Sequence, residues 1–138
     1  MDNVRPIRGK FPENEKITIN LGFVDLGRID LLVQEGFFSN RSDFIRTAIR
    51  NQLENQSETV SKTLDRHTME LGLRDYTVAD LEAVQAANEL LHIKVVGLAR
   101  IAGDVTPELA LATIGSINVL GALQASADVK KALAERIT

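Results

Sequence analysis

The side chains in this sequence that are best suited to catalysis or metal binding are few and scattered. Histidine is the residue type that changes charge near neutral pH. The two in this chain of 138 residues, His67 and His92, stand far apart, and the chain has no cysteine. Protein metal sites usually gather several such ligands at close spacing. We therefore interpret both as surface or strand-end histidines and expect no metal site.

Three aspartates and two glycines recur along the chain, but each set has a structural explanation. Asp80, Asp104 and Asp128 are 24 residues apart. Each lies within about one turn of a predicted helix start, where the helix dipole favours an acidic side chain. Gly97 and Gly121 stand inside apparent strands rather than in a phosphate-binding loop, which indicates bulges or close packing. No nucleophile is paired with a base, so we expect neither an enzyme nor a cofactor.

Composition and charge narrow the class of protein further. No apolar run approaches the roughly 20 residues that cross a bilayer, and residues 1–10 lack the apolar stretch of a secretory signal. The net charge of -3 argues against a generally basic nucleic-acid binder. Residues 1–56 nevertheless balance eight basic against eight acidic side chains, whereas residues 57–138 hold eight against eleven. The absence of cysteine fits a reducing compartment.

The N-terminal half begins with a predicted flexible arm, residues 1–13, whose basic side chains are Arg5, Arg8 and Lys10. These charges either solubilise the arm or contact a partner. Residues 16–21 then alternate polar and apolar side chains, which predicts a strand. Nothing next to it in the sequence offers a hairpin partner.

Two amphipathic helices are predicted after this strand. Apolar residues at three- and four-residue spacing predict a helix over residues 25–35, with Gly36 as its C-cap. A second helix follows Phe38, with either Ser39 or Asn40 as its N-cap. Its apolar stripe consists of Phe44, Ile45, Ala48, Ile49 and Leu53.

The polar stretch after the second helix separates the chain into regions. Residues 54–62 are mostly polar, which indicates a solvated helical extension or a linker. We place a domain boundary near residue 56. We therefore expect an N-terminal domain over residues 14–56, a helical extension or linker over 57–76 and a further domain over 77–138.

The C-terminal region contains a repeat. Residues 93–112 align with residues 117–136 at an offset of 24, and a degraded helical copy is expected around Asp80. Each unit reads as a strand followed by a helix, which predicts parallel strands joined by crossover helices. The fold class is therefore α+β with a small α/β repeat domain. Units of this kind bury little alone, so we expect residues 77–138 to drive oligomerisation.

The order of elements in residues 14–54 resembles the ribbon-helix-helix family of DNA-binding proteins, which includes CopG-, Arc- and MetJ-like proteins. The stretch GRIDLLVQEGFFSNRSDFIRTAIRNQL shows the family's two apolar helices around a glycine turn. In that family two chains pair their strands into an antiparallel ribbon that enters the DNA major groove. The resemblance implies an intertwined homodimer that binds double-stranded DNA as a cytoplasmic, nucleoid-associated transcriptional regulator of repressor type.

Roles for individual residues follow from the resemblance. The outward face of the ribbon would read base edges through Lys16, Thr18 and Asn20. Lysine can donate to guanine, asparagine can bond adenine through two atoms, and threonine offers a hydroxyl and a methyl group. The start of the second helix would hold a phosphate with Ser39, Asn40, Arg41 and Ser42. Additional DNA-backbone contacts would come from Arg5, Arg8, Lys10, Arg46 and Arg50, although Arg46 and Arg50 suit solvent equally well. The dimer core would contain Ile17, Ile19, Leu21, Ile29, Leu32, Phe44, Ile45 and Ile49.

Three alternatives remain open at this point. One is an antitoxin that also represses its own operon, although the apolar, regular C-terminal repeat differs from the polar, irregular segments that fold on a toxin. Another is a DNA-anchored structural protein whose repeats stack edge to edge. A third has the C-terminal region sensing a small molecule, but no polar constellation in the sequence marks a pocket.

Overall fold

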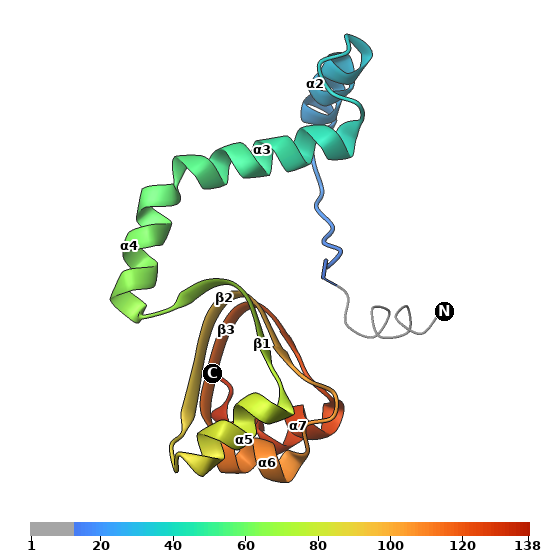
Figure 1. Cartoon of the computed structure of the whole chain (residues 1–138). Helices are drawn as coiled ribbons and strands as arrows, with labels where there is room; N and C mark the ends of the chain where they lie inside the picture. Colours follow the sequence, from blue (N-terminus) through green and yellow to red (C-terminus); the bar gives the residue numbers. More distant parts are fainter. Residues whose placement is uncertain (1–12) are drawn as a thin grey trace. The chain divides into compact units, whose positions relative to one another are not determined.

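The computed structural model describes residues 13–138, so Arg5, Arg8 and Lys10 of the predicted basic arm lie outside the described residues. The chain divides into two compact units, one of residues 14–63 and one that holds residues 64–138. Figure 1 shows the elements of each unit along the chain. Within the described residues, no helix is long and apolar enough to cross a membrane.

Helix α2 (Phe23–Gln34) leads the N-terminal unit and ends as its sequence predicts. Gly36 has a φ of +89°, a left-handed conformation that glycine adopts without a Cβ clash. Its N–H donates to the Val33 carbonyl and the Phe37 N–H donates to the Leu32 carbonyl, both at 3.0 Å. This pair of bonds is the Schellman motif, in which Glu35 is the C-cap and Gly36 is the left-handed residue that follows it and ends the helix.

Helix α3 (Arg41–Asn55) contacts α2 and carries the second apolar stripe. The structure decides between the two predicted N-caps, because the Asn40 side chain accepts the Asp43 N–H at 2.8 Å. Ser39 instead donates its backbone N–H to the Asp43 carboxylate at 2.8 Å. Phe38 and Phe44 pack edge to face across this turn, with ring centroids 5.0 Å apart, which fixes the entry into α3.

The region predicted as a helical extension or linker is helical and then becomes a strand. Helix α4 (Ser57–His67) follows α3 directly after Gln56. Strand β1 (Glu70–Tyr76) then begins, so the prediction of a linker up to residue 76 is wrong. The sequence pattern does not predict this strand, because Glu70 and Arg74 occupy the positions that face the helices and Leu71 and Leu73 face outward. In most strands the apolar residues face the core instead.

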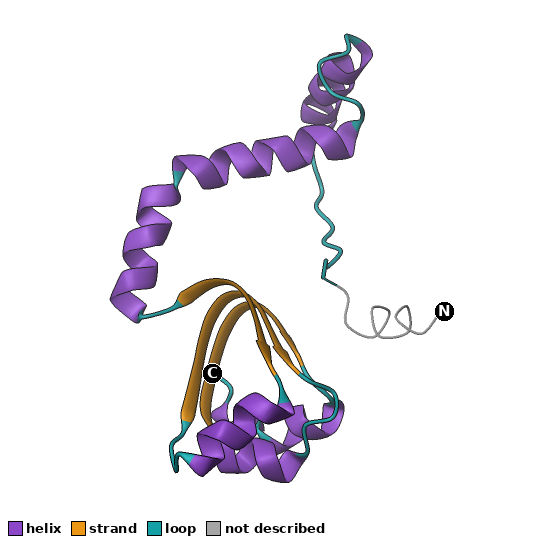
Figure 2. Cartoon of the chain, in the orientation of Figure 1, coloured by secondary structure: helices purple, strands orange, loops and turns teal. Residues whose placement is uncertain are grey.

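The C-terminal unit is a parallel sheet in the order β1-β2-β3 with its helices on the concave side (Figure 2). This confirms the predicted mixture of helices with parallel strands. The remaining elements are β2 (Leu91–Ile101), β3 (Ile114–Gln124), α5 (Val78–Ala86), α6 (Pro107–Thr113), α7 (Ala127–Ala132) and the 3-10 helix η1 (Ala134–Arg136). The helix predicted to end the second repeat unit is therefore divided between α7 and η1.

The first turns of these helices explain two of the three recurring aspartates. Asp80 forms a capping box with Thr77 at the start of α5, and Asp128 lies in the first turn of α7. The Thr77 backbone N–H, and then its hydroxyl, hold the pKa of Asp80 below its usual value. Asp104 differs, because α6 begins at Pro107 with Thr106 as its N-cap and leaves Asp104 in the preceding turn.

The core of this unit lies between the sheet and its helices. Alternate residues of β2 face it, and the buried set comprises Tyr76, Leu81, Ile93, Val95, Ala99, Ile101, Val105, Ala110, Ile114, Ile117, Val129 and Leu133. Residues 64–138 thus bury their own apolar side chains, which explains why the sequence shows a regular apolar repeat there.

A row of glycines crosses the sheet at one register position of the three strands. Gly72, Gly97 and Gly121 lie opposite one another in the ladders, and their φ angles are +131°, +139° and +119°. A Cβ on Gly97 would overlap the Gly72 carbonyl oxygen, and a Cβ on Gly121 would overlap that of Gly97. Close packing of backbone, one of the two explanations offered by the sequence, therefore accounts for Gly97 and Gly121.

Candidate nucleic-acid interface

The predicted base-reading residues lie on an exposed segment that precedes α2. Residues 14–22 carry neither helix nor strand within one chain, and Lys16, Thr18 and Asn20 are exposed. A strand requires a partner for its hydrogen bonds, and in the described residues none lies beside this segment. The predicted strand over residues 16–21 is therefore absent from the single chain.

The apolar residues of the same segment are also uncovered. Ile17, Ile19 and Leu21 have exposed fractions of 71%, 55% and 36%. Alternation places them on the opposite face from Lys16, Thr18 and Asn20 if the segment becomes a strand. An exposed row of large aliphatic side chains is unfavourable in water, at about 25 cal/mol for each Å² of apolar surface. The segment thus has one polar face and one apolar face that lacks a cover.

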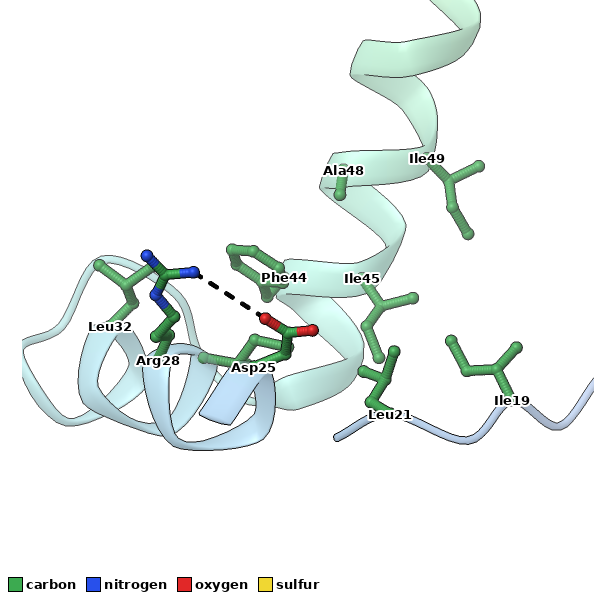
Figure 3. A pocket seen from close by; sticks show the side chains of 10 residues that line it. Ile19, Leu21, Asp25, Arg28, Leu32, Phe44, Ile45, Ala48 and Ile49 are labelled. Carbon is green, nitrogen blue, oxygen red and sulfur yellow. Dashed lines mark ion pairs between the residues drawn. The ribbon is translucent and has the colours of Figure 1, made fainter. Parts of the chain in front are cut away.

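Ile19 and Leu21 border an apolar hollow formed by α2 and α3 (Figure 3). Its volume is about 550 Å³, and its remaining lining residues are Asp25, Arg28, Ile29, Leu32, Phe44, Ile45, Ala48 and Ile49. Asp25 and Arg28 form an exposed ion pair at 3.9 Å within this lining. Most residues predicted for a dimer core are therefore brought together around one open apolar surface.

The burial of this unit is incomplete in a single chain. Among residues 14–63, Ile29 alone is buried, with an exposed fraction of 6%. Ile49 and Leu53 are 46% and 60% exposed. A stable small unit normally buries a contiguous set of such side chains. The apolar stripes of α2 and α3 consequently meet each other without enclosing a core.

The start of α3 shows which predicted phosphate ligands are already engaged. The Arg41 guanidinium binds Asp30 of α2 through two bonds, Nε to Oδ1 at 2.8 Å and Nη2 to Oδ2 at 2.9 Å. This hydrogen-bonded pair lowers the pKa of the Asp30 carboxyl and raises the pKa of Arg41. Asn40 is engaged as the cap. The Arg41–Asp30 pair joins residues eleven positions apart and was not predicted, because no local spacing signals a tertiary contact.

Other groups at this helix end remain available to an anion. Ser39 and Ser42 are exposed, and within the described residues no acceptor is found for the backbone N–H groups of Arg41 and Ser42. Unpaired first-turn N–H groups are a common anion-binding feature. The Asp43 carboxylate beside Ser39 adds a negative charge nearby and opposes that attraction.

Arg46 and Arg50 lie one turn apart on α3, and both are exposed. Neither forms an ion pair with another described residue, unlike Arg28 and Arg41. Together with Lys16 they leave three cationic side chains of this unit unneutralised. Their exposure suits both a contact with DNA and a position in solvent.

A second hollow lies in the C-terminal unit, where the sequence marked no pocket. Its volume is about 480 Å³, and it is lined by Thr68, Glu70, Arg74, Tyr76, Leu91, His92 and Lys94. Arg74 Nη1 is 2.9 Å from Glu70 Oε2, and burial raises the pKa of Tyr76. No local spacing in the sequence marks this hollow, because β1 brings residues near 70 beside the first residues of β2.

The two histidines have ordinary positions. His67 ends α4, and His92 is the exposed second residue of β2, with Nδ1 2.8 Å from the Ser116 hydroxyl of β3. Among the described residues, no group of three or more histidine or acidic side chains gathers as metal ligands. The site that collects the most predicted residues is thus the exposed segment with α2 and α3.

The family model described as a ribbon-helix-helix transcriptional regulator family matches residues 12–130, which is most of the chain. No curated protein and no solved structure matches the chain. The matched residues extend beyond α2 and α3 and include the sheet of the C-terminal unit.

Proposed function

The chain belongs to the ribbon-helix-helix transcriptional regulator family and is therefore a DNA-binding transcriptional regulator; we propose that it acts as a homodimeric, sequence-specific repressor. The observation that carries this proposal is the uncovered apolar hollow beside a segment that has no strand partner among the described residues. A second copy supplies both missing parts at once. The proposal includes a cytoplasmic location at the nucleoid.

Dimerisation follows from the alternation of residues 16–21. Two antiparallel copies of this segment satisfy each other's backbone groups, and their apolar faces then lie over the hollows of both chains. Ile17, Ile19 and Leu21, which are exposed in one chain, become buried with the stripes of α2 and α3. Folding of residues 14–63 and dimerisation are consequently coupled.

Base reading is assigned to the opposite face of the same ribbon. Lys16, Thr18 and Asn20 remain exposed when the apolar face is covered, because side chains alternate along a strand. A two-stranded ribbon fits the major groove, where lysine can donate to guanine and asparagine can bond adenine through two atoms. The dimer presents each of these residues twice, so we expect an operator with two-fold symmetry.

Phosphate binding is assigned to the start of α3, with the free N–H groups of Arg41 and Ser42 as the main donors. The side chains of Ser39 and Ser42 assist, whereas Arg41 contributes its charge only if DNA displaces Asp30. Arg46 and Arg50 supply further positive charge. Contacts of this type fix the position of the protein on DNA and make the affinity depend on salt.

An antitoxin role is less well supported. A toxin-binding segment normally stays polar and irregular until it folds on its partner. Residues 64–138 have a buried core of their own, built on all three strands. The C-terminal unit therefore has no need of a toxin to acquire structure.

Electrophoretic mobility shift on DNA selected from a random pool tests the proposal. A chain with Lys16→Ala, Thr18→Ala and Asn20→Ala is expected to lose preference for the selected sequence while it keeps weak binding to any DNA. Lys62→Ala removes an equal charge from an exposed position of α4 and is the matched control. Unchanged sequence preference in the triple variant would contradict the assignment of base reading to this face.

A further inference from the structure

The sheet of residues 64–138 ends in two edge strands that differ in how they are covered. At the β3 edge, Ile137 forms a bridge with Ile117, and the Thr138 N–H donates to the Ile117 carbonyl at 2.9 Å. The ladders place Glu70 opposite Val95 and Val95 opposite Val119. Another β1 strand added to β3 in the same register therefore begins opposite Val119, beyond the bridge. Residues 137 and 138 thus contact β3 at Ile117, whereas an added strand in this register pairs from Val119 onward.

Apolar side chains mark both edges on the convex face of the sheet. Leu71, Val96 and Leu120 form one row across the three strands. Val96 on the middle strand is half-buried between its neighbours, whereas Leu71 and Leu120 are 67% and 60% exposed. A strand added in register would place a second Leu71 beside Leu120 and continue the row. Each exposed leucine would then have apolar side chains on both sides, as Val96 does within one chain.

Charges that commonly protect an edge strand are neutralised on β1. Arg74 pairs with Glu70 at 2.9 Å, and Asp75 Oδ1 is 3.0 Å from Arg100 Nε of β2. Isolated charges on an edge prevent strands from pairing with other molecules. Since all three charged side chains of β1 have partners on their own sheet, the edge offers its backbone groups without an unpaired charge.

The helices at the two edges carry complementary charge. Helix α5 contacts α6, and α6 contacts α7, so the helices follow the order of the strands. Helix α5, which follows β1 in the chain, exposes Asp80 and Glu82 and has no basic residue. Helix α7, which follows β3, exposes two basic residues, Lys130 and Lys131, and one acidic residue, Asp128. A unit added at the β3 edge brings its α5 next to α7, where opposite charges attract and favour this order of contact.

We propose that the β3 edge of one chain binds the β1 edge of a second copy of the same chain, so that the parallel sheet continues from one molecule into the next. The contact joins two different surfaces, and such head-to-tail contacts repeat until a ring closes or a filament grows. This contact adds to the proposed function, because the copies that it links would be dimers bound side by side on DNA. The contact itself does not depend on DNA binding.

Two single variants separate the two surfaces. Leu71→Lys places a charge on the β1 edge, and Leu120→Lys places one on the β3 edge. Leu111→Lys is the matched control, because Leu111 is a 40% exposed leucine on the middle helix α6. Sedimentation velocity of the full chain over a range of concentrations measures assembly, and circular dichroism checks the fold. If either lysine variant fails to fold, the truncations Leu71→Ser and Leu120→Ser replace it.

The expected result is specific to a head-to-tail contact. The unaltered chain and Leu111→Lys sediment as species that grow with concentration, and each edge variant alone remains at the smallest species, with association weakened at least about tenfold. A mixture of the two edge variants assembles again, because each retains the surface that the other lacks. The proposal is overturned if the unaltered chain does not assemble, if one edge variant alone assembles normally, or if the mixture stays dissociated.

These outcomes are independent of the proposed regulator function. Loss of sequence preference is measured by mobility shift with the triple variant described above, at protein concentrations where the edge variants stay dissociated. A chain that assembles head to tail but binds no DNA contradicts the proposed function and leaves the edge contact intact. The reverse result, sequence-specific binding by a chain that never assembles, overturns the edge contact alone.

Discussion

Replacement of Gly97 by alanine tests how the C-terminal sheet is built. Gly97 has a φ of +139°, and an added Cβ would overlap the carbonyl oxygen of Gly72 on the neighbouring strand, with the Gly72 carbonyl carbon at 3.0 Å. Gly72 itself has a φ of +131°, but no atom lies within 4 Å of its Cβ position. Gly97→Ala therefore introduces both backbone strain and an overlap, whereas Gly72→Ala introduces the strain alone.

The difference between the two variants can be given a magnitude. A side chain in this part of φ space costs about 1–3 kcal/mol. Overpacking against groups that cannot move costs about 1–3 kcal/mol more, and here the obstacle is backbone held in the β1–β2 ladder. We expect Gly97→Ala to lower the free energy of unfolding by about 2 kcal/mol more than Gly72→Ala, a large part of the roughly 5–15 kcal/mol typical of a domain.

Tyr76 makes the measurement selective for this unit. It is the single tyrosine in a chain without tryptophan, and it is 8% exposed in the C-terminal core. Its fluorescence in a urea titration therefore reports the unfolding of residues 64–138. The experiment is run at a concentration too low for assembly. Equal destabilisation by the two alanines would refute the close approach of backbone at Gly97.

Three further perturbations test the N-terminal unit and the helix caps. Ile17→Ala removes a side chain that is 71% exposed in one chain. Because about 2 kcal/mol is lost from each of two copies, we expect the dimer dissociation constant in sedimentation equilibrium to rise roughly a hundred- to thousandfold. Leu31→Ala is the control, since Leu31 lies outside the hollow and its loss should change the dissociation constant little. Asp30→Asn releases Arg41, so mobility shifts should show tighter DNA binding that depends more steeply on salt. A plot of the logarithm of the binding constant against that of the salt concentration should steepen by about 0.9 for each additional phosphate neutralised. An unchanged slope would exclude Arg41 as a phosphate ligand. Thr77→Ala should lower the stability of the C-terminal unit by about 1 kcal/mol through loss of a cap. The pKa of Asp80 is depressed in the folded state. Its ionised carboxylate therefore stabilises the fold above the ordinary aspartate pKa of about 4, and this stabilisation is lost as the pH falls below that value. Asp80→Asn should consequently flatten the fall in the free energy of unfolding between about pH 5 and pH 3.

The parts of the fold that the sequence predicts are those controlled by neighbours along the chain. Gly36 ends α2 and Asn40 begins α3 because their own backbone and side-chain bonds suffice. The apolar spacing of α2 and α3 likewise reports which face each helix buries. In the C-terminal unit the apolar alternation of β2 and β3 is enough to predict parallel strands joined by helices.

The features of the fold that the sequence does not predict depend on contacts between residues far apart in the sequence. Strand β1 is ordered by its ladder with β2, and its inward positions hold Glu70 and Arg74 rather than apolar residues. Arg41 is paired with Asp30 of another helix, so the local pattern suggested a free cation where an ion pair exists. The hollow beside Arg74 arises from the same long-range pairing. These features require knowledge of the packing.

The assignment of base reading to the exposed segment is tested most directly by Asn20→Ala. Binding of the unaltered chain and of this variant is measured against every single-base change of a selected operator. We expect Asn20→Ala to lose about 1–3 kcal/mol of discrimination at one pair of symmetry-related positions and to keep its preferences elsewhere. A uniform loss of affinity at all positions, or an unchanged profile, would contradict the assignment of base reading to Asn20.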